Sequence, residues 1–318
     1  MRYLVRRAQR LVIVLLAVTL FTFLLVNVLP GDVAYEIAGT EATPETVAAI
    51  RKSLGLDRPV LVRYFEWLGG ILTGDWGKSL KSSEPVWQAI MARFPVSFEL
   101  MLIAQTMALM LALPLGIISA YRAGRRPDKV IGTLAFMSVS MPAFMFAILL
   151  IFLFALKLEW LPATGYEPLS KGLWANLKPM ILPALSFALV EWTILMRTLR
   201  AEMISVLQED YISLARAKGL GDGRILLAHA LRPSSFSMMT LLGLQVGRLI
   251  GGAIIIEEIF GIPGVGRLLI GAVYGRDFVV IQGCVTFIAI AFVLVNFLVD
   301  IAYSLLDPRV RVSGAAHG

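Results

Sequence analysis

The chain has very few of the residues from which proteins build cross-links and metal centres. Its 318 residues include one cysteine, Cys284, and two histidines, His229 and His317. A disulfide within the chain is therefore excluded, as is a metal site built from several thiolate and imidazole ligands. Charge is also scarce, because only 16% of the residues are charged against about 25% in an average soluble domain. This composition is typical of a protein that lies in a bilayer.

Motifs of nucleotide binding and catalysis are missing as well. The segment GDWGKS (74–79) ends like a phosphate-binding loop, but the first glycine of that motif would stand at position 72, which is Leu72. The spacing matters because the backbone amides of the loop must surround the phosphates. The sequence has no H-E-x-x-H and no G-x-S-x-G motif. We therefore expect no bond-breaking chemistry in this chain, and no cofactor of its own.

Hydrophobic sequence is abundant, at 58% of the residues with a mean hydropathy of +0.79. A helix needs about 20 apolar residues to cross a bilayer. Four runs of that scale carry no charge, and two more carry one charge each. The fold class predicted is an all-α membrane protein with six transmembrane helices, at residues 11–29, 100–121, 130–156, 179–196, 236–256 and 278–305.

The net charge of +7 follows the positive-inside rule, by which short cytoplasmic loops carry an excess of lysine and arginine. Basic residues cluster in 1–10, 122–129 and 197–235 and after the last span. Six spans put all of these on one side, so both termini are predicted to be cytoplasmic, in a bacterial-type inner membrane. Residues 30–97 have seven Lys/Arg and eight Asp/Glu and are expected outside. Basic flanks of spans indicate topology, so we expect no nucleic acid partner.

A polar helical segment, residues 209–233, stands between the fourth and fifth expected spans; we call it the insert. Its first part, 209–220, is expected to form a helix. Tyr211, Leu214 and Ala215 share one face of that helix, because they are spaced by three and four residues. Such a unit between two spans predicts a docking element.

The second half of the insert contains residues that typically begin or end helices. Gly219 is expected to end the first helix, because glycine tolerates the left-handed conformation. Asp222 is expected to cap a second helix, 223–231, and Pro233 to end it. Two short helices would then meet at a glycine hinge. From these residues alone, docking on a partner and docking on the membrane surface are equally open.

The insert resembles a known docking motif. ARAKGL (215–220) followed by HALRP (229–233) is similar to the EAA-type coupling motif of the dipeptide/oligopeptide permease family of ABC importers. The family commonly has Arg-Asn-Ala after His-Ala-Leu, whereas this chain has Arg232-Pro233-Ser234. Further segments resemble the same family in chain order: RYLVRR…LPGD (2–32), LGLDRPVLVRYFEWLGGILTGDWGKSL (54–80), EEIFGIPGVGRLL (257–269), RDFVVIQG (276–283) and VNFLVDIAYSLLDPRVR (295–311).

This resemblance implies the type I ABC-importer permease architecture, with residues 98–311 as the core permease domain and 312–318 as a tail. It implies a permease subunit of an ATP-driven importer for peptides or peptide-like solutes, which couples closure of the ATPases to alternating access. The implied partners are a second homologous permease, two ABC ATPase subunits, an extracytoplasmic substrate-binding protein and the lipid bilayer. ATP and Mg would be bound by the ATPase subunits. The implied ATPase-coupling residues are Glu209, Asp210, Tyr211, Ala215, Arg216, Ala217, Lys218, Gly219, Leu220 and His229.

Two alternatives stay open. The same architecture could carry nickel chelates, glutathione or oligosaccharides, since selectivity would lie largely in the binding protein. A protein of another class, an ATP-independent secondary transporter, would also be hydrophobic and multi-spanning. The insert argues against that second alternative, because such a transporter has no need of an ATPase dock.

Two charges fall inside expected spans. Glu191 and Arg248 each lie 12 residues into a span, roughly 18 Å at about 1.5 Å per residue, so both would be near mid-bilayer. An ionisable group there is costly and usually faces a bundle interior or water. The two side chains could form a structural ion pair or line the translocation path. Gln105 and Gln245 are weaker path candidates, because a glutamine bonded between helices is also common.

The last outer loop, 257–277, contains the turn cluster Pro263-Gly264-Val265-Gly266 between apolar runs. In the family that the chain resembles, loops of this kind face the binding protein that delivers substrate. Glu257, Glu258 and Arg267 are therefore the candidate contacts with such a protein.

Overall fold

The computed structural model describes residues 2–28, 43–53, 55 and 57–306, with some helical side chains, including that of Arg248, left undescribed. The predicted tail 312–318 lies outside these residues. The part of the chain described is helical, with no strand beyond an isolated bridge between Lys78 and Pro85, as the all-α prediction requires. It forms two compact units, the first Met1–Ser97 with Pro263–Leu294 and the second Phe98–Ile262 with Val295–Gly318.

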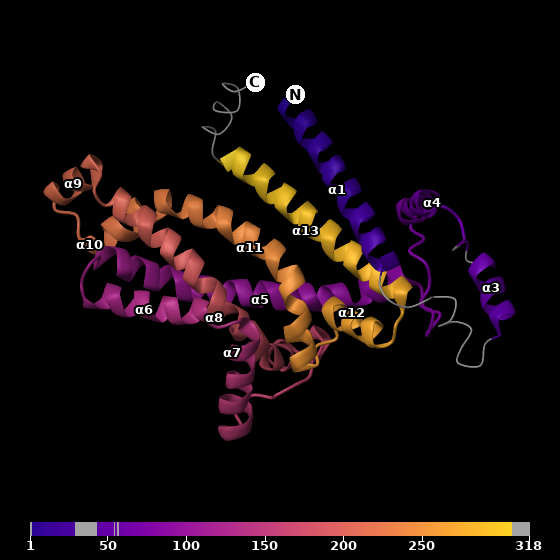
Figure 1. The fold of residues 1–318 in the computed structure, drawn as a ribbon. Coiled ribbons are helices and arrows are strands. Elements are labelled where there is room, and N and C mark those ends of the chain that lie inside the picture. Colours follow the sequence, from indigo (N-terminus) through magenta and orange to yellow (C-terminus); the bar gives the residue numbers. More distant parts are fainter. Residues whose placement is uncertain (1, 29–42, 54, 56, 307–318) are drawn as a thin grey trace. The chain divides into compact units, whose positions relative to one another are not determined.

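The first unit contains both long and short helices (Figure 1). Its helices are α1 (Arg2–Val28), α3 (Pro44–Ser53), α4 (Val60–Thr73), the start of α5 (Val86–Tyr121), α12 (Val265–Tyr274) and the start of α13 (Phe278–Leu306). The loop after α4 is fixed to α13 by Asp277, whose carboxylate accepts bonds from the Ser79 hydroxyl at 2.5 Å and the Leu80 amide at 3.1 Å. The start of α5 packs on α13 around Ile90, Ile281 and other buried apolar residues.

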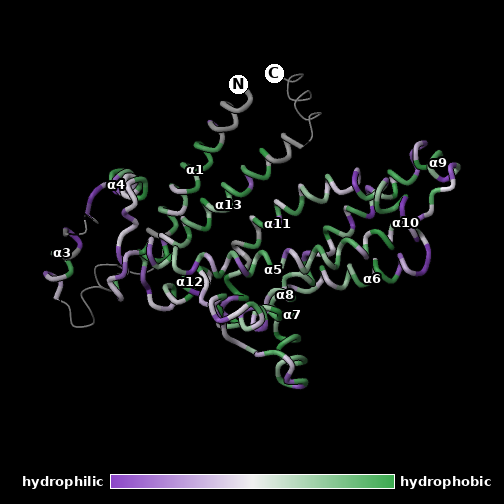
Figure 2. Tube along the Cα trace, turned by 180° about the vertical axis from the view of Figure 1, so that it is seen from behind, coloured by the Kyte–Doolittle hydropathy of each residue, from purple (hydrophilic) through white to green (hydrophobic). Residues whose placement is uncertain are grey.

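The second unit is built around α8 (Leu173–Val206). This helix contacts α6 (Arg126–Ser140), α7 (Ala143–Leu150) and α11 (Leu231–Phe260). Its core contains small alanines of α5 against the larger side chains of α8, among them Trp192, Met196 and Leu199. The remaining elements are the helical turns η1 (Ile151–Lys157), η2 (Leu169–Lys171) and η3 (Ile225–Ala230) and the short helices α9 (Asp210–Ala217) and α10 (Asp222–Arg224). Hydrophilic residues of this unit gather around α9, α10 and the turn before α6 (Figure 2).

The expected third span, 130–156, is not one straight helix. It is divided into α6 and into α7 with η1, and the two parts are bent by 100°. Met141 and Pro142 are both extended at the break. The physical reason is Pro142, because the proline ring disfavours the helical conformation of the residue before it. A proline inside a run of apolar residues was visible in the sequence, but the size of the bend was not.

Three described helices are long and apolar enough to cross a membrane, namely Val86–Tyr121, Leu173–Val206 and Phe278–Val299. The bent pair of α6 with α7 and η1 gives a fourth. The apolar stretch of α1 within the described residues is shorter, Leu11–Leu25. The expected span 236–256 falls within α11, which is not among the three. The number six therefore stays a prediction.

Candidate functional site

The first helix of the insert, α9, is shorter than predicted. It begins after Glu209, whose backbone is extended, and ends at Ala217. Gly219 follows in the left-handed conformation, with φ of +79°. The amides of Gly219 and Leu220 then bond back to the carbonyls of Arg216 at 2.9 Å and Ala215 at 3.2 Å. Gly219 thus stops the helix as its sequence position predicted, because an L-residue is strained at this backbone angle.

A small core holds the insert together. Ile212, Ala215 and Ile225 are buried against one another. Leu207 and Leu220 pack around them. This cluster attaches α9 to η3, so the insert is a folded unit and not a loose loop. The buried face of α9 contains Ile212 and Ala215. Ala215 therefore does not share an exposed face with Tyr211 and Leu214, contrary to the prediction from the sequence.

The opposite face of α9 presents apolar side chains to the outside. Tyr211 is 46% exposed and Leu214 is 56% exposed. A Cβ atom added at the neighbouring Gly219 would meet nothing within 4 Å. The polar candidates on α9 and just after it, Asp210, Arg216 and Lys218, are exposed, as are Glu209 and Ala217. The insert therefore carries a surface with large apolar groups and open space beside them.

The second half of the insert differs from its prediction. Gly221 precedes α10, no side chain caps that helix, and Asp222 is engaged elsewhere. The helical path does not end at Pro233, because α10 continues through η3, which has π-type turns, into α11. Pro233 lies just after the junction of η3 and α11, where the π-type turns accommodate a residue that has no N–H to donate. His229 lies half-buried in η3.

One anchor joins the insert to the end of α5. The Tyr121 hydroxyl donates a hydrogen bond to the Asp222 carboxylate at 2.5 Å. Tyr121 is the last residue of α5, and Asp222 is the first of α10. The bond therefore connects residues 101 positions apart in the chain. It holds the start of α10 against the turn between α5 and α6.

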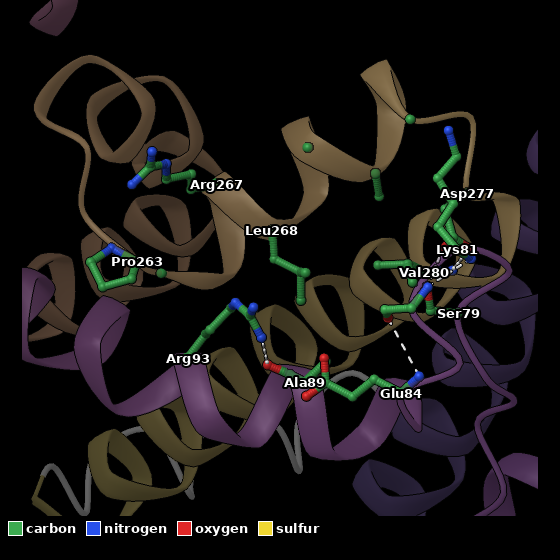
Figure 3. Close-up of a pocket in the computed structure, with 15 residues that line it drawn as sticks. Ser79, Lys81, Glu84, Ala89, Arg93, Pro263, Arg267, Leu268, Asp277 and Val280 are labelled. Carbon is green, nitrogen blue, oxygen red and sulfur yellow. Dashed lines mark hydrogen bonds between the residues drawn. The ribbon is translucent and has the colours of Figure 1, made fainter.

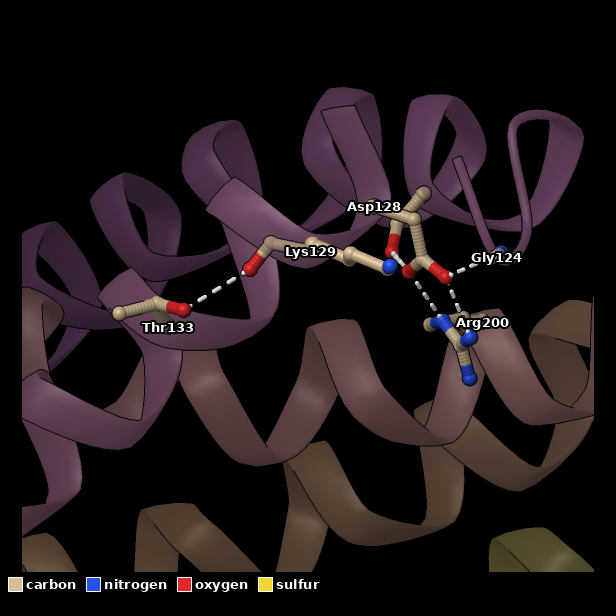
Figure 4. Close-up of polar contacts among 6 residues, drawn as sticks. Gly124, Asp128, Lys129, Thr133 and Arg200 are labelled. Carbon is tan, nitrogen blue, oxygen red and sulfur yellow. Dashed lines mark hydrogen bonds and ion pairs between the residues drawn. The ribbon is translucent and has the colours of Figure 1, made fainter. Parts of the chain in front are cut away.

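A second anchor is centred on the carboxylate of Asp128 (Figure 4). Arg200 donates to both of its oxygens, with N–O distances of 2.7 Å. The Ser119 hydroxyl donates at 2.5 Å and the Gly124 amide at 2.7 Å. The Asp128 side chain is 10% exposed and that of Arg200 is 33% exposed. A bidentate pair of this kind, with its remaining lone pairs satisfied, is among the stronger and more directional polar contacts in proteins.

Together the anchors fix the turn between α5 and α6 to α8, before the insert, and to the insert itself. Arg200 precedes the insert along α8, and Asp222 lies within it. A further bond from the Ser237 hydroxyl to the Glu202 carboxylate, 2.7 Å long, ties α8 to α11. None of these contacts was predicted, because the charges of 122–129 served only as a topology signal. Asp128 could have been singled out from the sequence, because it is the one acidic residue in the basic loop 122–129.

Three of the polar residues in expected spans come together. Gln105 Nε2 donates to Gln245 Oε1 at 3.0 Å, and Gln245 Nε2 donates to the backbone carbonyl of Glu191 at 3.2 Å. Both glutamines are buried, so the bonds connect α5, α11 and α8 inside the second unit. The side chain of Arg248 lies outside the described part of the structure, and its pairing with Glu191 stays a prediction.

The three residues predicted to contact a binding protein differ in exposure. Glu257 is fully buried, which corrects its assignment, because a buried carboxylate is not presented to a partner. Glu258, at the end of α11 in the second unit, is exposed. Arg267 of α12 is exposed in the first unit and lines a cavity of about 450 Å³ together with Arg93, Lys81 and Glu84 (Figure 3). Sequence position alone could not separate Glu257 from its neighbour.

Comparison with known families matches nearly the whole chain. Residues 112–312 match the family described as binding-protein-dependent transport system inner membrane component. Residues 1–101 match the N-terminal part of binding-protein-dependent transport system membrane components. The longer match contains the insert and the residues of both anchors.

Curated relatives match along almost their full length. A protein of Brucella abortus (strain 2308), named as a peptide transport system permease, is 42% identical over 306 residues, which cover 96% of this chain and 98% of the relative. A peptide ABC transporter permease of Sinorhizobium fredii is 34% identical, with 97% and 99% covered. A glutathione transport system permease of Salmonella choleraesuis is 37% identical, with 98% and 99% covered.

The Asp128 anchor makes a direct prediction about stability. Asp128→Ala should destabilise the folded chain by roughly 2–4 kcal/mol, because it leaves Arg200 without its partner in a partly buried position. The measurement is loss of monodisperse protein on heating in mild detergent. Asp57→Ala, at an exposed carboxylate, is the matched control. If the two variants lost monodisperse protein at the same temperature, the stabilising role of the Asp128 anchor would be contradicted.

Proposed function

The chain belongs to the family of binding-protein-dependent transport system inner membrane components and is a permease of the ABC-transporter type, and from this we propose a role for its insert. The insert is the surface on which an ATPase subunit docks. One observation carries the proposal, which is that Tyr211 and Leu214 are exposed on a helix whose other face is buried through Ile212 and Ala215. Apolar side chains exposed on a segment proposed to be cytoplasmic mark an interaction surface. Gly219 leaves room for close approach.

The proposed mechanism uses the insert as a lever. Two ATPase subunits bind ATP and Mg, and their closure moves the insert of this chain and that of a second, homologous permease. Because the small core of Ile212, Ala215 and Ile225 keeps the insert rigid, the motion passes through the anchors to α8, α5 and α6. The pathway between the two permeases would then change from inward-facing to outward-facing. This chain contributes coupling and a path, whereas ATP hydrolysis belongs to the separate subunits.

We place the chain in the bacterial inner membrane with six spans and both termini in the cytoplasm. The basic loop 122–129 and the insert are on the same side in this arrangement, which agrees with the Tyr121–Asp222 contact between them. Residues 30–97 would then face outward. Exposed Glu258 and Arg267 are the remaining candidates for contact with a binding protein that delivers substrate there.

Peptides are the proposed cargo. Two of the relatives reported above carry names of peptide permeases, with 42% and 34% identity. Glutathione is the second candidate, because a relative named for it is 37% identical over almost its whole length, and glutathione is itself peptide-like. Nickel chelates and oligosaccharides stay as more distant alternatives, and an ATP-independent secondary transporter would leave the insert's exposed surface without a use.

Docking can be tested by placing a charge on the exposed face of α9. Leu214→Glu should abolish co-purification of ATPase subunits while the chain remains folded, because Leu214 makes no contribution to the buried core of the insert. Leu72→Glu is the matched control, since Leu72 is 80% exposed on α4 and lies on the proposed outer side. Quantitative mass spectrometry of the purified complexes gives the readout. Equal ATPase content in the Leu214→Glu and Leu72→Glu variants would contradict the proposal.

The polar residues of the spans give a second test. If Glu191 and Arg248 line the path, Glu191→Gln and Arg248→Met should each change peptide uptake without altering the subunits that co-purify. An ionisable group in a span is retained at a cost and is commonly functional. Uptake of labelled di- and tripeptides into cells or vesicles measures the effect. Normal uptake by both variants would remove these residues from the path.

A further inference from the structure

The groove between α6 and α8 lies beside the Asp128 anchor and has no role in the function proposed above. It encloses about 470 Å³. Its lining includes Ser119, Asp128, Gly132, Phe136, Arg197 and Arg200. All of these residues belong to the second unit. The groove is therefore a defined cavity of one compact part of the chain.

The groove changes from polar to apolar along its length. Helices α6 and α8 run antiparallel, because Asp128 bonds Arg200 while the Thr193 hydroxyl donates to the Ala135 carbonyl. Phe136 lies eight residues beyond Asp128 on the same face of α6, about 12 Å deeper at about 1.5 Å per residue. Phe136 is 72% exposed. An occupant that fits both ends has a polar head and an apolar body.

The polar end carries a net positive charge. The Asp128 carboxylate is fully engaged by its four donors. Arg197, one turn deeper than Arg200 on α8, is exposed. Among the residues described, Arg197 has no hydrogen bond or ion pair. The side chain that remains to receive a ligand is thus a guanidinium, whose fork of donors matches phosphate.

The apolar end of the groove is formed by Phe136 of α6 and Met196 of α8. Most of the Phe136 side chain is exposed there. A free phosphate or nucleotide would make no use of that surface, whereas an acyl chain would bury it. Basic pockets between helices at the cytoplasmic side of a membrane are known to hold anionic lipid head groups.

We propose that this groove binds one anionic phospholipid of the inner leaflet, with its phosphate on Arg197 and an acyl chain along Phe136. The inference rests on the orientation given under the proposed function, in which the turn 122–127 is cytoplasmic. In that orientation the phosphate lies one helical turn inside the anchor. A bound lipid would thereby brace α6 against α8 at the point where the anchor holds the insert.

Gly132 offers a variant that fills the groove without distorting the fold. A Cβ atom added there meets nothing within 4 Å, and Gly132 lies within α6. Gly132→Leu should therefore exclude lipid while the chain folds normally. Gly69→Leu is its matched control, because Gly69 is exposed in α4 and also has open space around its Cβ position. Arg197→Gln removes the phosphate ligand, and Arg126→Gln removes an exposed charge that does not line the groove.

The experiment is native mass spectrometry of the full-length chain with its co-purifying subunits, titrated with phosphatidylglycerol or phosphatidylcholine of the same chains. The wild type should retain one phosphatidylglycerol in preference to phosphatidylcholine. Arg197→Gln should weaken that retention about fivefold, as expected for one interfacial arginine. Gly132→Leu should reduce it to the phosphatidylcholine level. Arg126→Gln should change it by less than about twofold, because exposed charges are screened, and Gly69→Leu should leave it unchanged.

Four results would overturn the proposal. Equal retention of the two lipids would show that charge is not recognised. An equal loss in Arg126→Gln would show diffuse attraction without a site. Binding of inorganic phosphate without any retention of phosphatidylglycerol would show a phosphate site alone. Loss of a co-purifying permease in Gly132→Leu, with lipid retention unchanged, would show that a protein covers the groove. The ATPase content of the same samples is measured separately, so failure of the lipid site is distinguishable from failure of ATPase docking.

Discussion

The ion pair between Asp128 and Arg200 is the contact on which the second unit depends. The carboxylate also accepts bonds from Ser119 and Gly124, so one side chain unites the end of α5, the turn, the start of α6 and α8. A carboxylate that is 10% exposed would be costly to bury without this set of donors. Its satisfaction therefore fixes how α5, α6 and α8 meet, and α8 leads directly into α9.

The position of the insert follows from this junction of α5, α6 and α8, which we call the corner. The Tyr121–Asp222 bond continues it to the insert, and the core around Ile212 keeps the insert folded. What remains outward is the face with Tyr211 and Leu214. The proposed docking function would use this element, which is held at two points and exposes apolar groups, to pass on a partner's motion. The same corner also borders the groove proposed for lipid, which would link membrane composition to the stiffness of this lever.

Much of the fold was predictable from the sequence, because long apolar runs and turn residues depend on local physics. The all-α class, the stop at Gly219 and the polar character of the insert all follow from composition and spacing. Three features could not be predicted in this way, because each depends on what packs nearby. They are the large bend at Pro142, the continuous helical path through Pro233 and the burial of Glu257. The anchors were missed for the same reason. Asp128 and Arg200 are 72 residues apart, and nothing local to either residue indicates the other.

The most direct test of this account is photo-cross-linking in intact membranes from a benzoylphenylalanine placed at position 214. That position is exposed and lies outside the core of the insert, so the probe should be tolerated. We expect a single strong adduct with an ABC ATPase subunit, identified by mass spectrometry. Adducts with lipid alone, while the chain remains folded and assembled, would show that the insert lies on the membrane surface and would contradict the central claim.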